Sequence, residues 1–178
     1  MRESSRSSGK HAALNFPDRL KCRKPAKERL VNEHLAMNAP HMFPIRVYYE
    51  DTDFSGAVYH SNYLRFFERA RTELLRDLGV DQVALFDRTG LGFVVRTLHI
   101  DYLRPARMDN SLRVETHVER LGRASIDLVQ ALWREAEELA VGKVRLAIVA
   151  RGRPQPIPAD IYAKLESFRA ISSSEGST

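Results

Sequence analysis

The sequence has one cysteine, Cys22, among 178 residues. A single thiol cannot form an internal disulfide, nor supply the paired cysteine ligands of a structural zinc site. No stretch approaches the roughly 20 consecutive apolar residues of a membrane-spanning helix, and the first ten residues lack the apolar core of a secretory signal. These absences predict a cytoplasmic protein whose contact with membranes is at most peripheral.

Motifs for nucleotide phosphates and serine nucleophiles are also missing. The chain contains no G-x-G-x-x-G, no G-x-x-x-x-G-K-[ST] and no G-x-S-x-G. It therefore lacks the glycine-rich turns of Rossmann and P-loop enzymes and the nucleophile elbow of α/β-hydrolases.

The net positive charge is confined to one end of the chain. The chain has 28 lysines and arginines and 23 acids. Residues 1–42 contain nine of the basic residues and four of the acids, so residues 43–178 contain nineteen of each. Residues 1–42 show no sustained periodicity and predict a basic, disordered extension. A nucleic-acid or lipid-binding arm and a transit peptide are alternatives, but acids in this segment oppose a transit peptide. Met37 and Met42 favour an extension from an upstream start codon, and we expect no nucleic-acid partner.

Residues 43–178 have the pattern of one ordered domain. A β-rich run over Ile45–Tyr49 precedes a polar loop. Apolar residues then recur at three- and four-residue steps from Tyr63 to Leu78, which predicts one long buried helix. A shorter helix follows at Gln82–Phe86.

After Gly90 the hydrophobic period changes from helical to two. Short connectors favour antiparallel pairing of the four predicted strands, which are residues 93–102, 112–121, 125–133 and 141–151. A proline-rich exit leads to a last helix at Ala159–Phe168. Segregated elements of this order predict an α+β domain, with an antiparallel sheet of about five strands around one central helix.

Chemically useful side chains are concentrated between residues 48 and 63. Asp51 and Asp53 precede a glycine turn that leads to His60, at the start of the long helix. Unpaired N–H groups and the positive dipole end at a helix start can stabilise an oxyanion, while a loop carboxylate can act as base or nucleophile. Two alternatives stay open. The acids can serve only as helix caps, or can join His60 in a metal site, although no second histidine has ligand spacing.

Four segments of the sequence resemble one known family. They are RVYYEDTD (46–53), GAVYHSNY (56–63), FERARTE (67–73) and DYLRPAR (101–107). They are similar to the hot-dog-fold acyl-CoA thioesterases of the 4-hydroxybenzoyl-CoA thioesterase type, and most to the subfamily associated with the Tol-Pal cell-envelope system. The similarity extends over about residues 43–168. It implies a hot-dog fold, with homodimers or homotetramers whose active sites form between protomers.

The resemblance also implies roles for individual residues. Asp53 matches the catalytic carboxylate, which activates water or attacks the thioester directly. Tyr59 and His60 lie where the helix start receives the thioester oxygen, and the His60 side chain belongs to the site. Asp51 matches an acid for which we expect a structural role.

Substrate contacts implied by the resemblance are assigned to Gly56, Asn62 and Arg123, the last as a phosphate ligand for CoA. The expected reaction is hydrolysis of short-chain or aromatic acyl-CoA to acid and CoA, without metal or organic cofactor; acyl carrier protein is a further possible partner. The alternative is a weakly catalytic hot-dog module that binds acyl-CoA, acyl carrier protein or an envelope partner.

Overall fold

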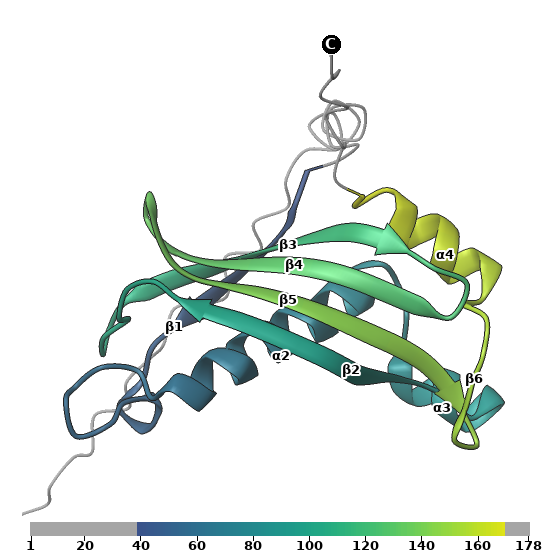
Figure 1. Cartoon of the computed structure of the whole chain (residues 1–178), viewed down its shortest axis with the longest axis horizontal. Coiled ribbons are helices and arrows are strands. Elements are labelled where there is room, and N and C mark those ends of the chain that lie inside the picture. The colour runs from purple at the N-terminus through teal and green to yellow at the C-terminus, as the bar shows by residue number, and fades with distance from the viewer. Residues whose placement is uncertain (1–38, 170–178) are drawn as a thin grey trace, which may run out of the picture. The chain divides into compact units, whose positions relative to one another are not determined.

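The computed structural model describes residues 39–169 (Figure 1). The predicted extension over residues 1–42 therefore lies almost wholly outside the described residues. The elements in chain order are β1 (His41–Arg46), η1 (Tyr49–Asp51, a 3-10 helix), α2 (His60–Asp77), α3 (Gln82–Thr89), β2 (Leu91–Tyr102), β3 (Ser111–Leu121), β4 (Ser125–Arg134), β5 (Glu137–Ala150), β6 (Arg153–Pro154) and α4 (Ala159–Glu166).

The strands form one antiparallel sheet in the order β1-β3-β4-β5-β2, to which the two residues of β6 add beside β5. The long helix α2 packs across one face of this sheet (Figure 1). Buried residues alternate along β3, β4 and β5, as expected for strands with one face on a core. This arrangement confirms the predicted α+β hot-dog fold.

A glycine lets α2 approach the sheet closely. Phe67 is fully buried, and a methyl group added to Gly142 of β5 would lie 2.9 Å from its ring. Beside this contact, the buried amide of Gln130 donates to the Phe67 carbonyl at 3.0 Å and accepts from Arg71 at 2.7 Å. Partners on both sides of the amide offset the cost of burying it.

The first strand lies earlier in the chain than predicted. Ile45–Tyr49 was the predicted strand, but β1 covers His41–Arg46. The strand ends because the Tyr48 N–H donates to the Asp51 carboxylate at 2.9 Å, which closes the turn of η1. At the other end, buried His41 places Nε2 3.0 Å from the Asp77 carboxylate, so ordered structure begins before residue 43.

The two edge strands of the sheet differ in how readily another strand could pair with them. β1 is short and contains Pro44, which has no N–H to offer another strand. β2 has twelve residues and no proline, and Val94–His99 are all exposed. Val95 pairs with buried Leu146 and so shares the face that packs on α2, yet it is 51% exposed. Residues 39–169 leave this edge uncovered.

Among residues 39–169, no helix is long and apolar enough to cross a membrane.

Substituting Gly142 with alanine tests the helix-to-sheet contact. The new methyl group would overlap the Phe67 ring, so the free energy of unfolding should fall by about 1–3 kcal/mol. Gly92→Ala is the matched control, because its methyl would meet Phe86 at an ordinary 3.9 Å. Urea unfolding measures both variants, and equal stabilities would contradict the close approach.

Candidate functional site

A tight hairpin presents Asp53 beside the start of α2. The Asp53 N–H donates to the Ala57 carbonyl at 2.9 Å, and the Gly56 N–H donates back to the Asp53 carbonyl at 3.0 Å. Gly56 has φ +74°, a value that glycine adopts without the steric cost of a side chain. The structure therefore gives Gly56 a conformational role in the hairpin that carries Asp53.

Ser55 holds the Asp53 carboxylate in place. One carboxylate oxygen, Oδ1, accepts the Ser55 hydroxyl at 2.6 Å and the Ser55 N–H at 2.8 Å. Mainly through the hydroxyl, and then through the N–H, Ser55 keeps the pKa of Asp53 below its ordinary value; positive charge on His60 lowers it further. Asp53 is exposed, so an ionised carboxylate with one restrained oxygen faces outward from the hairpin.

The first turn of α2 carries the second part of the site. The helix begins at His60, and its N-cap, Tyr59, provides no side-chain cap. Within the described residues, the N–H groups of His60 and Ser61 have no acceptor. Free N–H groups and the helix dipole together make this point electropositive. The chain thus brings the predicted residues Asp53, Tyr59 and His60 together.

Asp51 and Asn62 join the acid loop to the helix. Asp51 is buried, and its carbonyl accepts the Tyr59 N–H and the Asn62 side-chain amide, both at 2.9 Å. These contacts agree with the structural role expected for Asp51. Asn62 is also buried and uses its amide within the loop, so its predicted contact with substrate remains a prediction.

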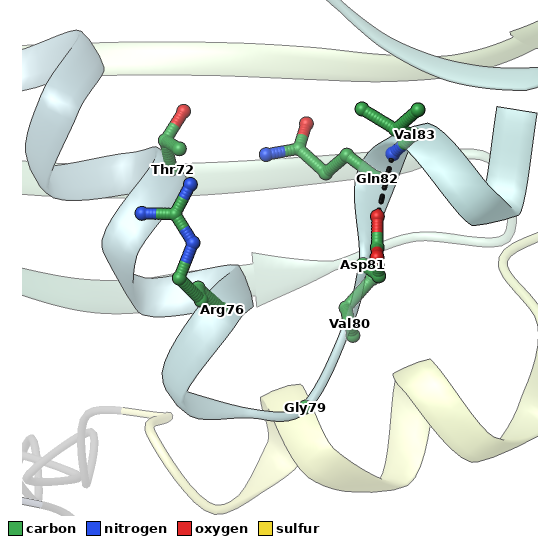
Figure 2. Close-up of a pocket in the computed structure, with 7 residues that line it drawn as sticks. All are labelled: Thr72, Arg76, Gly79, Val80, Asp81, Gln82 and Val83. Atoms are coloured by element: carbon green, nitrogen blue, oxygen red, sulfur yellow. Dashed lines mark hydrogen bonds between the residues drawn. The ribbon is translucent and has the colours of Figure 1, made fainter.

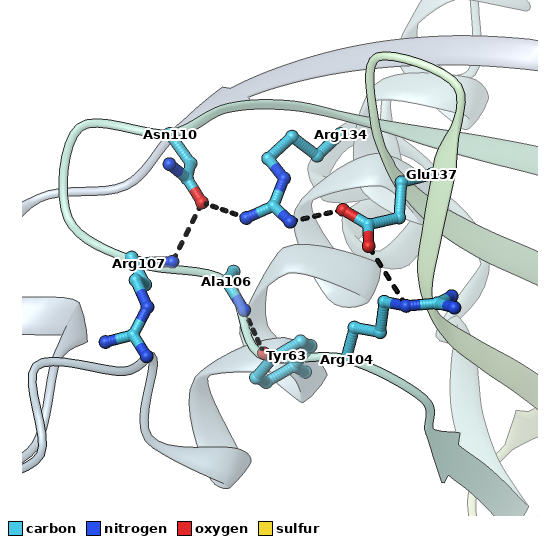
Figure 3. A network of polar contacts seen from close by, with 7 residues as sticks. All are labelled: Tyr63, Arg104, Ala106, Arg107, Asn110, Arg134 and Glu137. Atoms are coloured by element: carbon cyan, nitrogen blue, oxygen red, sulfur yellow. Dashed lines mark hydrogen bonds and ion pairs between the residues drawn. The ribbon is translucent and has the colours of Figure 1, made fainter.

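A polar network supports the segment after β2, against which the hairpin packs (Figure 3). Ala57 forms a β-bridge with Arg107, and the Ala106 N–H donates to the Tyr63 hydroxyl at 2.9 Å. The Arg107 N–H and the Arg134 guanidinium both donate to the Asn110 side-chain oxygen, at 2.9 and 3.1 Å. Figure 3 also shows Glu137 held between Arg134 and Arg104. Hydrogen bonds and ion pairs therefore connect the segments at the end of the sheet that lies next to the site.

Sequence reasoning missed Ser55 and Tyr102. The Tyr102 hydroxyl donates to the His60 carbonyl at 3.0 Å, although the two residues are 42 positions apart. Ser55 could have been found from its spacing, because serine two residues after aspartate favours this local hydrogen bond. The Tyr102 contact depends on how β2 lies against α2, which no local pattern reveals.

Arg123 lies at the opposite end of the sheet from Asp53. It stands in the turn after β3, where its carbonyl accepts the Ile157 N–H at 2.8 Å. The eleven residues of β3 separate this turn from the acid loop, a span of roughly 35 Å. Arg151 and Arg153 follow β5 at the same end, and all three arginines are exposed. One chain does not bring its predicted phosphate ligand to its own carboxylate.

A cavity of about 620 Å³ lies between the end of α2 and the start of α3 (Figure 2). Asp81 on its wall caps α3 by accepting the Val83 N–H at 3.0 Å. The cavity is at the far end of α2 from Asp53 and contains no predicted site residue. In residues 39–169, no three His, Cys, Asp or Glu side chains group closely enough to hold a metal ion.

Removing the Ser55 hydroxyl should weaken its hold on the carboxylate. In Ser55→Ala the pKa of Asp53 should rise toward its ordinary value, because the largest interaction that lowers it is lost. Carbon-13 NMR titration of the Asp53 carboxylate measures this change. Ser167→Ala, which removes a hydroxyl from the α4 end, should leave the titration unchanged. An unaltered or lower pKa in Ser55→Ala would contradict the assigned contact.

Comparison with known proteins places the sequence in a family. A family model described as the thioesterase-like superfamily matches residues 47–165. An acyl-CoA thioesterase YbgC of Haemophilus influenzae is 49% identical over 129 residues, which cover 71% of this chain and 95% of that protein.

Two solved structures have the same fold. A probable thioesterase from Bartonella henselae superposes with a TM-score of 0.65 and 42% identity, covering 67% of this chain and 100% of the other. A Thermus thermophilus thioesterase complexed with coenzyme A and Zn gives a TM-score of 0.63 and 26% identity, over 74% and 95% of the two chains. By its sequence, by its fold and by the family model that matches more than half of its length, the chain belongs to the thioesterase-like superfamily.

Proposed function

We propose that this protein hydrolyses acyl-CoA thioesters, with Asp53 as its catalytic carboxylate. The observation that carries the proposal is the hairpin that sets an ionised, exposed Asp53 beside the free N–H groups of the α2 first turn. The relative from Haemophilus influenzae, named an acyl-CoA thioesterase, supports the substrate class.

The geometry divides the reaction between the helix start and the loop. The thioester oxygen accepts the N–H of His60 or Ser61, where the helix dipole stabilises the negative charge that develops on it. Asp53 removes a proton from an attacking water, or attacks the carbonyl carbon itself to give a mixed anhydride that water then opens. In both routes the C–S bond breaks, and the products are the free acid and the CoA thiol. An aspartate is ionised near neutral pH at its ordinary pKa, and the lowered pKa of Asp53 keeps it in the form that both routes require.

Aromatic side chains around the helix start favour short or aromatic acyl groups. The rings of Tyr59 and His60 lie 4.3 Å apart, and Tyr102 meets His60 edge-on at 6.5 Å. Tyr59 and Tyr102 are each 46% exposed, so their rings offer flat apolar surface beside the reacting carbonyl. His60 would orient the acyl group in this setting or assist proton transfer.

A second copy of the chain would complete the site. Within the part of the chain that the structure describes, the exposed Val94–His99 edge offers unpaired backbone groups, and Val95 is exposed apolar surface. If the β2 strands of two copies pair antiparallel, the start of β2 in one copy lies beside Tyr102, at the end of β2 in the other. Because Leu91 pairs with Ala150, the turn after β5 lies at that same starting end.

This pairing gives the distant arginines a use. Three arginines of the second copy would approach the Asp53 site of the first, and their guanidinium groups would bind the CoA phosphates. They are the partner subunit's Arg123, the partner subunit's Arg151 and the partner subunit's Arg153. Within residues 39–169 none of the three arginines forms an ion pair, which leaves them free to bind an anion. The Thermus thermophilus structure with coenzyme A supports this ligand for the fold.

We also propose finer assignments. The motif resemblance supports the Tol-Pal-associated subfamily of the 4-hydroxybenzoyl-CoA thioesterase type. An acyl-CoA substrate supports action in the cytoplasm, where thioesters of acyl carrier protein would be alternative substrates. Pairing of two dimers would give a tetramer.

The catalytic assignment predicts that Asp53→Asn lowers kcat by about a hundredfold or more, because the amide can neither accept the proton nor attack the carbonyl. The assay is hydrolysis of acetyl- to palmitoyl-CoA, 4-hydroxybenzoyl-CoA and phenylacetyl-CoA. Asp87→Asn, an exposed carboxylate on α3, is the matched control and should keep wild-type rates. Wild-type turnover in Asp53→Asn would remove Asp53 from the mechanism. Tight binding of acyl-CoA without turnover by the wild type would favour the binding module.

The edge-pairing proposal predicts that Val95→Lys converts a dimer or tetramer into smaller species. A lysine at this position would bury its charge against the second copy. Light scattering after size-exclusion chromatography measures the mass, and Val83→Lys on exposed α3 is the control. A monomeric wild-type protein, or a variant of unchanged mass, would contradict pairing through β2.

A further inference from the structure

Tyr102 connects the edge strand to the first turn of α2. It is the last residue of β2, and its backbone pairs with Ala140 of β5. Its hydroxyl donates to the His60 carbonyl at 3.0 Å. This hydrogen bond joins the exposed edge of the sheet to the helix turn that carries the free N–H groups.

The Tyr102 ring is held in one orientation by its neighbours. It packs edge-on against Tyr63 at 5.3 Å and 85°, and against His60 at 6.5 Å and 89°. Tyr63 is itself fixed, because it is 4% exposed and its hydroxyl accepts the Ala106 N–H at 2.9 Å. A ring supported in this way directs its hydroxyl at the His60 carbonyl with little loss of side-chain entropy.

The carbonyl that Tyr102 contacts belongs to the same planar peptide group as the N–H of Ser61. A hydrogen bond to the carbonyl oxygen fixes the plane of this group and polarises it, which makes its N–H a stronger donor. Burial, and then the neighbouring Tyr63, raise the pKa of Tyr102, so the phenol remains a donor at neutral and mildly alkaline pH.

We propose that Tyr102 is a positioning residue that aims and polarises the His60–Ser61 peptide, so that the Ser61 N–H becomes a second donor to the thioester oxygen. This inference rests on the proposed function and deepens it. It assigns to Tyr102 an action through the backbone, with no contact to the reacting atoms. It also makes the exposed edge strand part of the machinery that stabilises the oxyanion.

The test uses the full chain with Tyr102→Phe, which keeps the ring and removes only the hydroxyl. We expect kcat for acyl-CoA hydrolysis to fall by about fivefold to tenfold, the effect of one lost hydrogen bond, with KM unchanged. The Ser61 amide resonance in a proton–nitrogen correlation spectrum should move to lower proton frequency. Tyr162→Phe is the matched control, an exposed tyrosine on α4.

Each outcome separates the positioning role from a structural one. Tyr102→Leu removes the ring as well and should lower both kcat and the thermal midpoint, whereas Tyr102→Phe should melt within a few degrees of the wild type. Wild-type kcat in Tyr102→Phe, or a raised KM at unchanged kcat, would overturn the inference and leave the thioesterase proposal standing. A wild-type protein that hydrolyses none of the acyl-CoA panel would overturn the proposed function instead.

Discussion

The buried carbonyl of Asp51 is the contact on which the site depends. It accepts the Tyr59 N–H and the Asn62 amide, and the Asp51 carboxylate accepts the Tyr48 N–H. One residue thus fixes the end of β1, the turn of η1 and the first turn of α2 relative to one another. Because burial makes an unpaired polar group costly, this loop has few alternative conformations. The hairpin that carries Asp53 begins two residues later, so the position of its first residue is fixed by the same contacts.

The restrained loop holds an exposed carboxylate in one position, where it can act on one bound substrate. Asp53 is exposed, and its pKa is lowered by Ser55 and less by the nearby His60, against an opposing effect of desolvation that is smaller than that of Ser55. The proposed function draws the remaining selectivity from surfaces that residues 39–169 leave exposed, which are the rings beside α2 and the edge of β2. A site divided between two copies, as proposed, would couple activity to assembly.

Sequence patterns were sufficient for the parts of the fold that depend on periodicity. The helix stripe at Phe67 and the four long alternating segments predicted α2 and the strands β2 to β5. The predicted position of β1 was wrong, because the Tyr48 N–H donates to the Asp51 carboxylate and ends the strand where β propensity would continue it. Asp53 and His60 were assigned to the site through a recognised motif, since acids before a helix could equally be caps. The separation of Arg123 from Asp53 was beyond prediction, because it depends on which ends of the strands meet.

The most direct test of the account is a crystal structure of the chain with an unreactive ketone analogue of an acyl-CoA, in which a methylene group replaces the thioester sulfur. The ketone oxygen should lie about 3 Å from the N–H of His60 or Ser61. The Asp53 carboxylate should face the carbonyl carbon, and the phosphates should contact arginines of a second copy. An analogue bound with its carbonyl away from the α2 first turn would contradict the account.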